Sequence, residues 1–226
     1  MNIKQNIENL NKEISELSVK MGKDPKQLKL VAVSKTVGND QIREAYGEGV
    51  FDFGENRVQD LLHKMDTIQE DISWHHIGRL QTNKVKYLIG KNILIQSLDR
   101  KELVDEISKL SIKQGINTEC LVQINVSGEE SKAGINPEET KDFLKYIGTQ
   151  KGIIVLGLMT IAPNVEDFEE IRRVFAKMRE IYIDIQNERI DNNIQMKYLS
   201  MGMSHDYKIA IEEGSNMLRI GTSIFY

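Results

Sequence analysis

Cysteine, proline and long apolar runs are scarce in this chain. Cys120 is the one cysteine among 226 residues, so no internal disulfide is possible, which fits a reducing cytosol. The longest uncharged stretch, 152–165, is interrupted by Pro163 and is shorter than the ~20 residues of a membrane span. The N-terminus lacks a basic segment followed by an apolar block. We therefore expect a cytoplasmic protein that does not enter a membrane.

Charge is balanced and spread along the chain. There are 30 Lys and Arg against 34 Asp and Glu, a formal net charge of -4. A dedicated nucleic-acid-binding protein needs clustered basic residues that neutralise phosphates, and the sequence argues against one. Hydrophobic residues make up 40% and charged residues 28%, which is typical of a soluble globular protein and excludes a disordered chain.

Short apolar runs alternate with longer polar, periodic segments. The first segment predicts an amphipathic helix, whose apolar face is formed by Ile3, Ile7, Leu10, Ile14, Leu17 and Met21. Runs rich in β-branched residues predict eight strands, at 30–33, 50–53, 74–77, 93–95, 120–126, 153–159, 197–201 and 217–224. The segments between them predict helices at 39–48, 56–69, 82–89, 100–114, 137–149, 165–187 and 205–213. Asn136 and Ser204 precede two of these as candidate N-caps.

This alternation predicts an α/β fold with a parallel sheet and right-handed crossovers. Eight strands in a chain of this length fit a single (β/α)8 TIM barrel, formed as one domain by residues 1–226. An open doubly wound sheet is the alternative for a chain in which strands and helices alternate. The chain stops just after the eighth strand, so we expect no eighth helix and expect the N-terminal helix to cover that gap.

Polar residues follow the strands, at the barrel end where active sites form. Lys35 closes the first strand. A lysine there is usually just solvated, but in a partly enclosed mouth an amine can have a lowered pKa and form a Schiff base with a carbonyl or with pyridoxal phosphate. Segments 200–204 and 219–222 place glycine and hydroxyl residues in the loops that commonly bind phosphate. The alternative is a pair of ordinary turns with Arg219 in a surface ion pair.

Two further polar stretches, 54–57 and 74–84, follow the second strand and span the third. The adjacent His75 and His76 point to opposite faces of a strand, so they cannot readily share a metal ion. We expect one imidazole to pack in the barrel wall with a hydrogen bond and the other to meet the helix layer. Cys120 belongs to an apolar strand and is expected in the core rather than as a nucleophile.

Several motifs together resemble the pyridoxal phosphate homeostasis protein family. They occur in matching order from about residue 30 to the end, at 31–36 (VAVSKT), 53–59 (FGENRVQ), 74–84 (WHHIGRLQTNK), 125–134, 157–160 (GLMT), 199–204 (LSMGMS) and 218–222 (LRIGT). The resemblance implies a barrel similar to the N-terminal domain of alanine racemase, with pyridoxal 5'-phosphate (PLP) bound as a Schiff base.

By this resemblance Lys35 carries the Schiff base and Arg219 approaches the pyridine nitrogen. A cationic partner leaves that nitrogen unprotonated, which weakens the electron sink and disfavours carbanion chemistry. The remaining cofactor-binding residues that it implies are Asn56, His75, Met159, Ser200, Met201, Ser204, Gly221 and Thr222. Two departures stand out: His76 replaces a residue that is usually apolar or aromatic, and the chain ends with 224–226 where many relatives continue.

The leading hypothesis is a cytosolic protein that stores, buffers or delivers PLP, acting as a monomer, with PLP-dependent apo-enzymes as possible acceptors. A racemase needs a second acid–base residue, which a following domain and a dimer partner supply. The chain ends with the eighth strand, so we expect that domain to be absent. We therefore expect no established catalytic activity. The alternatives are a racemase-like PLP enzyme, a Schiff-base aldolase acting on a phosphorylated sugar, and a regulatory module that binds partner proteins.

Overall fold

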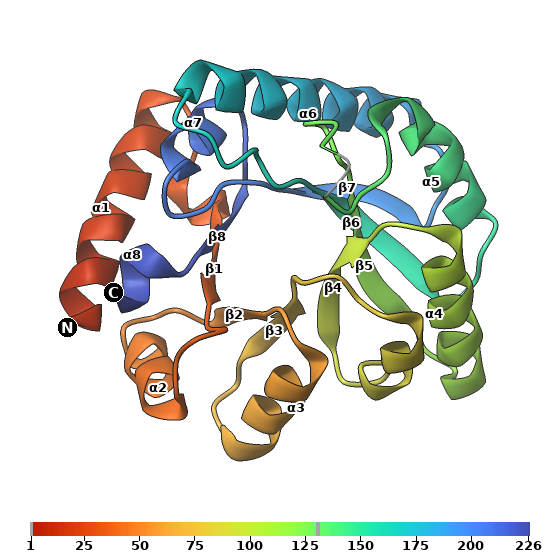
Figure 1. The fold of residues 1–226 in the computed structure, drawn as a ribbon, viewed down its shortest axis with the longest axis horizontal. Helices are drawn as coiled ribbons and strands as arrows, with labels where there is room; N and C mark the ends of the chain where they lie inside the picture. Colours follow the sequence, from red (N-terminus) through yellow and green to blue (C-terminus); the bar gives the residue numbers. More distant parts are fainter. Residues whose placement is uncertain (1, 130–131) are drawn as a thin grey trace.

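Eight parallel strands close into a barrel in this computed structural model, which describes residues 2–129 and 132–226. The strands are neighbours in chain order: β1 (Lys29–Val33), β2 (Asp52–Glu55), β3 (Ser73–His76), β4 (Ile93–Leu98), β5 (Thr118–Gln123), β6 (Ile153–Met159), β7 (Ile194–Ser200) and β8 (Met217–Ile220). Closure is made by β8 and β1, which pair with Ala32 opposite Ile220. The predicted (β/α)8 barrel is confirmed, and the open sheet was the wrong alternative (Figure 1).

Helices surround the barrel: α1 (Ile3–Lys20), α2 (Asn39–Gly47), α3 (Val58–Thr67), α4 (Lys101–Gln114), α5 (Thr140–Gly148), α6 (Phe168–Glu188), α7 (Tyr207–Glu212) and α8 (Thr222–Phe225). Three short 3-10 segments join them, η1 (Pro25–Gln27), η2 (Thr82–Tyr87) and η3 (Pro137–Glu139). The helix expected at 82–89 is therefore the 3-10 segment η2, and the one expected at 137–149 is divided into η3 and α5.

The N-terminal helix α1 covers the barrel beside its last strand, as predicted. It packs on α8, α7 and α2, and both chain termini lie at this side of the molecule (Figure 1). The Asn6 side chain donates to the Ile224 carbonyl at 3.0 Å, and the Tyr207 hydroxyl donates to Glu13 at 2.5 Å. The expectation of no eighth helix was wrong, because the single-turn helix α8 follows β8.

One predicted cap was also wrong. The helix α7 begins at Tyr207, not next to Ser204, and its N-cap is Asp206. The carboxylate of Asp206 accepts a 2.5 Å hydrogen bond from the Met203 backbone N–H, so it organises the loop that precedes the helix. Asn136 does occupy the N-cap position of η3, but its side chain makes no capping bond to the backbone.

The apolar core has two layers. The larger joins strand and helix residues and includes Phe53, Leu103 and Phe175, all fully buried. The smaller is a cluster of strand residues, Val31, Leu121, Leu156, Met159 and Met217. Cys120 is fully buried in the larger layer, and burial raises the pKa of its thiol, which agrees with the expectation that it is a core residue.

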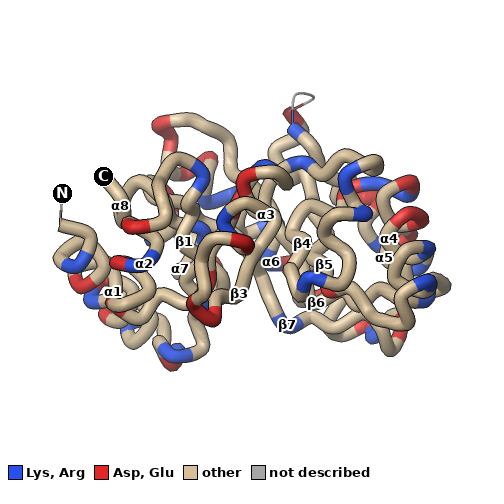
Figure 2. The backbone as a smooth tube through the Cα atoms, turned by 90° about the horizontal axis from the view of Figure 1, so that it is seen from below, with Lys and Arg blue, Asp and Glu red and all other residues tan. Residues whose placement is uncertain are grey.

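Charged residues of both signs alternate along the helices (Figure 2). Within the described part of the chain, no helix is both long enough and apolar enough to cross a lipid bilayer. A few charged side chains are buried: Glu55, Lys64 and Arg219 are each less than a tenth exposed. Arg219 lines the candidate site, and the pair of Glu55 with Lys64 lies next to the strand end that leads into it.

Candidate functional site

A cavity of about 630 Å³ opens at the carboxyl ends of the strands. The predicted site residues that line it are Lys35, Asn56, Ser204, Arg219, Gly221 and Thr222. The other lining residues, which were not among the individually predicted site residues, are Val33, Thr36, Ile77, Ile161, Met203, His205, Ser223 and Tyr226. The lining contains a lysine and an arginine but no Asp or Glu side chain, so the cavity suits an anionic ligand.

Lys35 follows β1 and extends from the rim into this cavity lining. Its side chain is exposed, and its Nζ makes no hydrogen bond or ion pair with any described residue. The amine is therefore free to meet a ligand. The backbone on either side of it is held more firmly than the amine itself.

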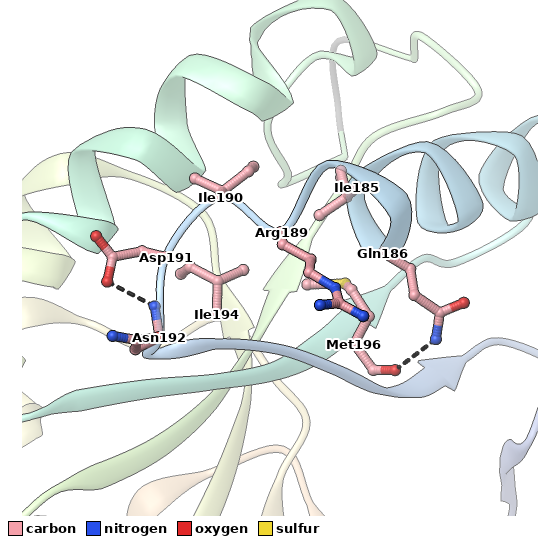
Figure 3. Close-up of a pocket in the computed structure, with 8 residues that line it drawn as sticks. All are labelled: Ile185, Gln186, Arg189, Ile190, Asp191, Asn192, Ile194 and Met196. Atoms are coloured by element: carbon pink, nitrogen blue, oxygen red, sulfur yellow. Dashed lines mark hydrogen bonds between the residues drawn. The ribbon is translucent and has the colours of Figure 1, made fainter.

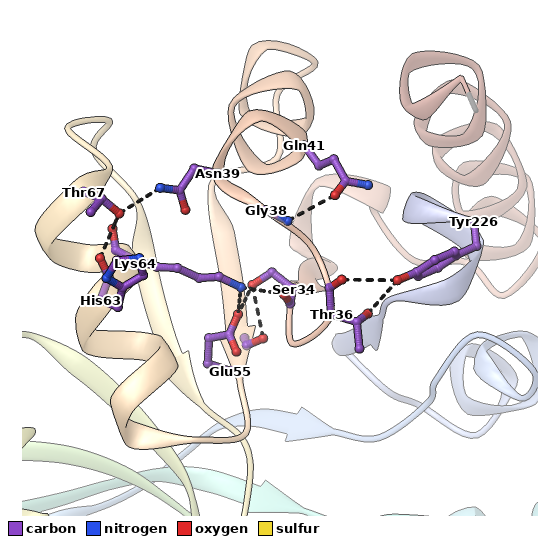
Figure 4. Close-up of polar contacts among 11 residues, drawn as sticks. Ser34, Thr36, Gly38, Asn39, Gln41, Glu55, His63, Lys64, Thr67 and Tyr226 are labelled. Carbon is purple, nitrogen blue, oxygen red and sulfur yellow. Dashed lines mark hydrogen bonds and ion pairs between the residues drawn. The ribbon is translucent and has the colours of Figure 1, made fainter.

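On the N-terminal side, a buried ion pair fixes the peptide that leads into Lys35. Lys64 Nζ of α3 lies 2.6 Å from Glu55 Oε1 and donates to the Ser34 carbonyl at 2.6 Å. The Ser34 hydroxyl also donates to Glu55 Oε1 at 2.6 Å (Figure 4). Glu55 is fully buried, so this cluster orders the end of β1 through charge-assisted hydrogen bonds.

On the C-terminal side, Tyr226 reaches across from the end of the chain. Its hydroxyl donates to Thr36 Oγ1 at 2.9 Å and lies 3.3 Å from the Thr36 carbonyl (Figure 4). Sequence reasoning treated this terminus only as a departure from relatives at the rim of the last strand. In the structure the phenol is part of the cavity wall next to Lys35.

Arg219 is the second cation of the cavity and is almost completely buried, with 4% of its surface exposed. Its Nη1 donates to Ser200 Oγ at 2.6 Å and its Nη2 to the Thr160 carbonyl at 2.7 Å. Burial lowers its pKa to about 10, partly opposed by the carboxylate of Asp206. The guanidinium is thus still charged at neutral pH and is held in one orientation, which excludes the surface ion pair considered from sequence.

Below Arg219, a chain of hydrogen bonds crosses the barrel interior. Ser200 Oγ donates to Gln96 Oε1 at 2.7 Å, and Gln96 Nε2 donates to His75 Nδ1 at 2.8 Å. An amide nitrogen can only donate, so the His75 proton is on Nε2, which donates to Asp52 Oδ1 at 2.8 Å. Asp52 Oδ1 also accepts from Lys29 Nζ at 2.7 Å. We call these five side chains the interior relay.

Burial lowers the pKa of His75, although the neighbouring Asp52 carboxylate opposes this effect. A neutral imidazole is also what the hydrogen bond from Gln96 requires. The expectation that one imidazole lies in the barrel wall with a hydrogen bond, while the other meets the helix layer, is confirmed by His75 and His76. Among the described residues, no group of three or more His, Cys, Asp and Glu side chains is arranged to hold a metal ion.

Four predicted site residues do not line the cavity. His75 and Ser200 belong to the interior relay and reach the cavity only through Arg219. Met159 lies in the smaller apolar cluster and Met201 in the larger one, and both are fully buried. The relay members that sequence reasoning missed are Gln96, Asp52 and Lys29, and the one local signal for Gln96 was an amide within the mainly apolar strand β4.

At the far side of the cavity, Ser204 faces the loop that follows β8. Its hydroxyl accepts a 3.3 Å hydrogen bond from the Ser223 backbone N–H. Gly202 adopts φ +101°, and a Cβ there would lie 2.6 Å from the Ala210 side chain, so only glycine permits this turn. Hydroxyl and backbone donors thereby gather at the ends of β7 and β8.

His76 gives the protein a distinctive pH dependence. Its ring is fully buried, neither ring nitrogen has a hydrogen-bond partner among the described residues, and burial lowers its pKa to about 4. A histidine in the unfolded chain titrates near 6.5, so on acidification the unfolded state binds the proton first and stability falls between about pH 6.5 and 4. The full shift corresponds to about 3 kcal/mol.

Between pH 7 and pH 4.5, we expect His76→Phe to reduce the acid loss of stability by about 2 kcal/mol, because phenylalanine cannot take up the proton. The measurement is urea unfolding at pH 7 and at pH 4.5. His63→Phe, which removes an exposed imidazole on α3, is the matched control and should keep the wild-type slope. An identical loss of stability in wild type and His76→Phe would show that His76 is not the group responsible.

A separate hollow of about 570 Å³ lies between the end of α6 and the start of β7 (Figure 3). Within it, Gln186 Nε2 donates to the Met196 carbonyl at 3.3 Å, and the Asn192 N–H donates to Asp191 at 2.6 Å. These polar groups satisfy one another. The hollow is at the amino end of a strand, the face of such barrels that serves stability rather than chemistry.

The fold and the cavity define a barrel of the alanine racemase type. The family model described as "Alanine racemase, N-terminal domain" matches residues 3–226. An alanine racemase of Clostridium difficile superposes with a TM-score of 0.78 at 14% identity, covering 99% of this chain and 56% of that chain, which is a likeness of fold.

Two nearer relatives narrow the class. The pyridoxal phosphate homeostasis protein of Aquifex aeolicus is 45% identical over 226 residues, which is 100% of this chain and 98% of that protein. PipY of Synechococcus elongatus, in its structure "with PLP bound", superposes with a TM-score of 0.81 at 30% identity, covering 94% of this chain and 100% of that chain. The chain belongs to the pyridoxal phosphate homeostasis protein family.

Proposed function

We propose that this protein binds PLP as a Schiff base on Lys35 and takes part in intracellular PLP homeostasis by storing, buffering or delivering the cofactor. The observation that carries the proposal is the pairing of an exposed lysine amine with a buried arginine in one cavity whose lining includes no Asp or Glu side chain. Membership of the family supports it, as does the PLP bound by PipY.

The residues of the cavity fit an anionic aldehyde. Its volume, about 630 Å³, lies within the range of small-molecule sites. Lys35 would supply the amine that forms an imine with the aldehyde carbon, whose oxygen would leave as water. Asn56 supplies a neutral amide at the same wall. When bound, the cofactor would offer an electron sink whose strength depends on the charge next to its ring nitrogen.

Arg219 would limit that electron sink. Because its guanidinium only donates hydrogen bonds and has a pKa of about 10, it would favour an unprotonated pyridine nitrogen in a bound cofactor. The interior relay holds the guanidinium through Ser200 and His75, so we assign these two residues to positioning Arg219. An arrangement that restrains carbanion chemistry suits storage better than turnover.

The donors at the ends of β7 and β8 are the proposed phosphate site. Ser204 and Thr222 supply hydroxyl groups. A Cβ on Gly221 would lie 3.0 Å from the Val33 carbonyl oxygen, so glycine lets the end of β8 pack closely on β1 at this wall of the cavity. Met159 and Met201 pack beneath this region as apolar support. In this proposal residues 1–226 act as one cytoplasmic domain and as a monomer, and PLP-dependent apo-enzymes are the acceptors.

The spectrum of the purified protein tests the proposal. After addition of PLP we expect a visible absorbance band, and after borohydride reduction a pyridoxyl adduct on the peptide that contains Lys35. Labelling that requires an added phosphorylated sugar would favour an aldolase instead. Turnover of amino acids at enzyme-like rates, lost in Lys35→Ala, would overturn a role restricted to homeostasis.

A further inference from the structure

A second cavity, of about 730 Å³, lies between the loop that leads into α3 and the loop that follows β3. It is lined by Asn56, Arg57, Val58, Gln59, His76, Arg79, Leu80, Gln81, Thr82, Asn83, Lys84 and Arg100. These are the two polar stretches that the sequence singled out, and the proposed function leaves most of them unused. We call this cavity the loop cleft.

The loop cleft is strongly cationic although the whole chain carries a net charge of -4. Arg57, Arg79 and Lys84 form no ion pair with any residue in 2–129 or 132–226, and no carboxylate lines the cleft. Arg100 is different, because its Nη1 lies 2.5 Å from Asp99. Three uncompensated cations therefore face one concave space.

The two walls of the cleft are packed against each other at Gly78. A Cβ on this glycine would lie 2.3 Å from the Asn56 carbonyl oxygen, so any larger residue would force the loops apart. The cleft is thus built into the fold rather than formed by loose surface side chains.

The start of α3 adds backbone donors to one wall. The first amides of a helix have no partner within the helix, and the N-cap residue Arg57 makes no side-chain capping bond to them. Val58 and Gln59 lie on the cleft wall. The partial positive charge at the N-terminus of α3 adds to the positive charge of these cations.

His76 supplies independent evidence for a ligand. It alternates with His75, which faces the barrel interior, so its ring faces the helix layer and lines the cleft. The ring is fully buried, and neither nitrogen has a hydrogen-bond partner within residues 2–129 and 132–226. Leaving such a group unpaired is costly, and a ligand in the cleft is positioned to satisfy it.

We propose that the loop cleft is a second ligand site, which binds a small phosphate-bearing anion through Arg57, Arg79 and the start of α3, with His76 as a neutral hydrogen-bond partner at its floor. The site is separate from the Lys35 cavity, although Asn56 lines both. It needs no aldehyde and no Schiff base.

The test is a titration of the isotope-labelled full chain with inorganic pyrophosphate at constant ionic strength, followed by nuclear magnetic resonance. We expect saturable shifts at the amides of Val58 and Gln59 and at the ring nitrogens of His76. Arg57→Gln with Arg79→Gln should weaken this binding at least about tenfold, because two charge-assisted contacts are lost. Both arginines are exposed, so the fold should be retained.

Lys86→Gln with Lys91→Gln removes two exposed cations outside the cleft lining and is the matched control, which should bind pyrophosphate as wild type does. Equal affinity of the two double variants would overturn the proposal. So would shifts that fail to saturate, or shifts at 221–223 with none at Val58 and Gln59.

Discussion

Lys35→Ala is expected to abolish the visible absorbance of the PLP-loaded protein and the adduct fixed by borohydride. No other lysine among the residues lining the cavity can replace it, because the only other cation with a long side chain there is Arg219, which cannot form an imine. The fold should persist, since the Lys35 side chain is exposed and has no partner among described residues. Circular dichroism checks the fold, and absorbance with peptide mapping checks the label.

Lys113→Ala is the matched control. Lys113 is an exposed lysine in the last turn of α4, outside the cavity lining, and its removal should leave the spectrum and the mapped adduct unchanged. A full visible band in Lys35→Ala would mean that another amine carries the aldehyde. The proposed Schiff base on Lys35 would then be wrong.

The barrel could be predicted because each strand carries its own local signal. The run at 153–159 matches β6 at both ends, since an apolar β-branched segment there is bounded by turn residues. The predicted second strand, 50–53, stopped short of the observed end at Glu55, because two of the last residues of β2 are a glycine and a charged residue that propensity disfavours. Pairing with neighbouring strands overrides that preference.

Part of the cavity lining could also be predicted from the positions of the strands. Lys35, Asn56 and Arg219 stand at or next to strand ends, and the topology of a barrel brings strand ends together. How deeply each side chain is buried could not be predicted from its position at a strand end. Met201 follows a strand just as Asn56 does, yet its side chain packs in the larger apolar layer, because the loop after β7 turns back at Gly202.

Contacts between distant residues carried no local signal at all. Tyr226 meets Thr36 across 190 positions of sequence, and Gln96 meets Ser200 across 104. Each of these hydrogen bonds depends on barrel closure, which a sequence pattern can imply without giving the register. The interior relay was for that reason invisible until the strands were placed.

The buried ion pair between Lys64 and Glu55 is expected to contribute strongly to stability, because it also fixes the backbone directly before Lys35. Lys64→Met is expected to destabilise the protein by about 3–5 kcal/mol, since it leaves the carboxylate of Glu55 buried without its cation and the Ser34 carbonyl without its donor. Urea unfolding followed by the fluorescence of Trp74, the single tryptophan, measures the loss.

Two further variants separate charge from packing. Adding Glu55→Gln to Lys64→Met removes the stranded carboxylate, so part of the lost stability should return. Lys177→Met on α6 breaks an exposed pair with Glu180, 3.2 Å away, and should cost less than about 1 kcal/mol. If Lys64→Met were no more destabilising than Lys177→Met, the buried pair could not be what orders the end of β1. If Lys64→Met is strongly destabilised and also binds PLP more weakly, the ion pair supports cofactor binding as well as stability. The reason is that Lys64 Nζ holds the carbonyl of Ser34, the residue directly before Lys35.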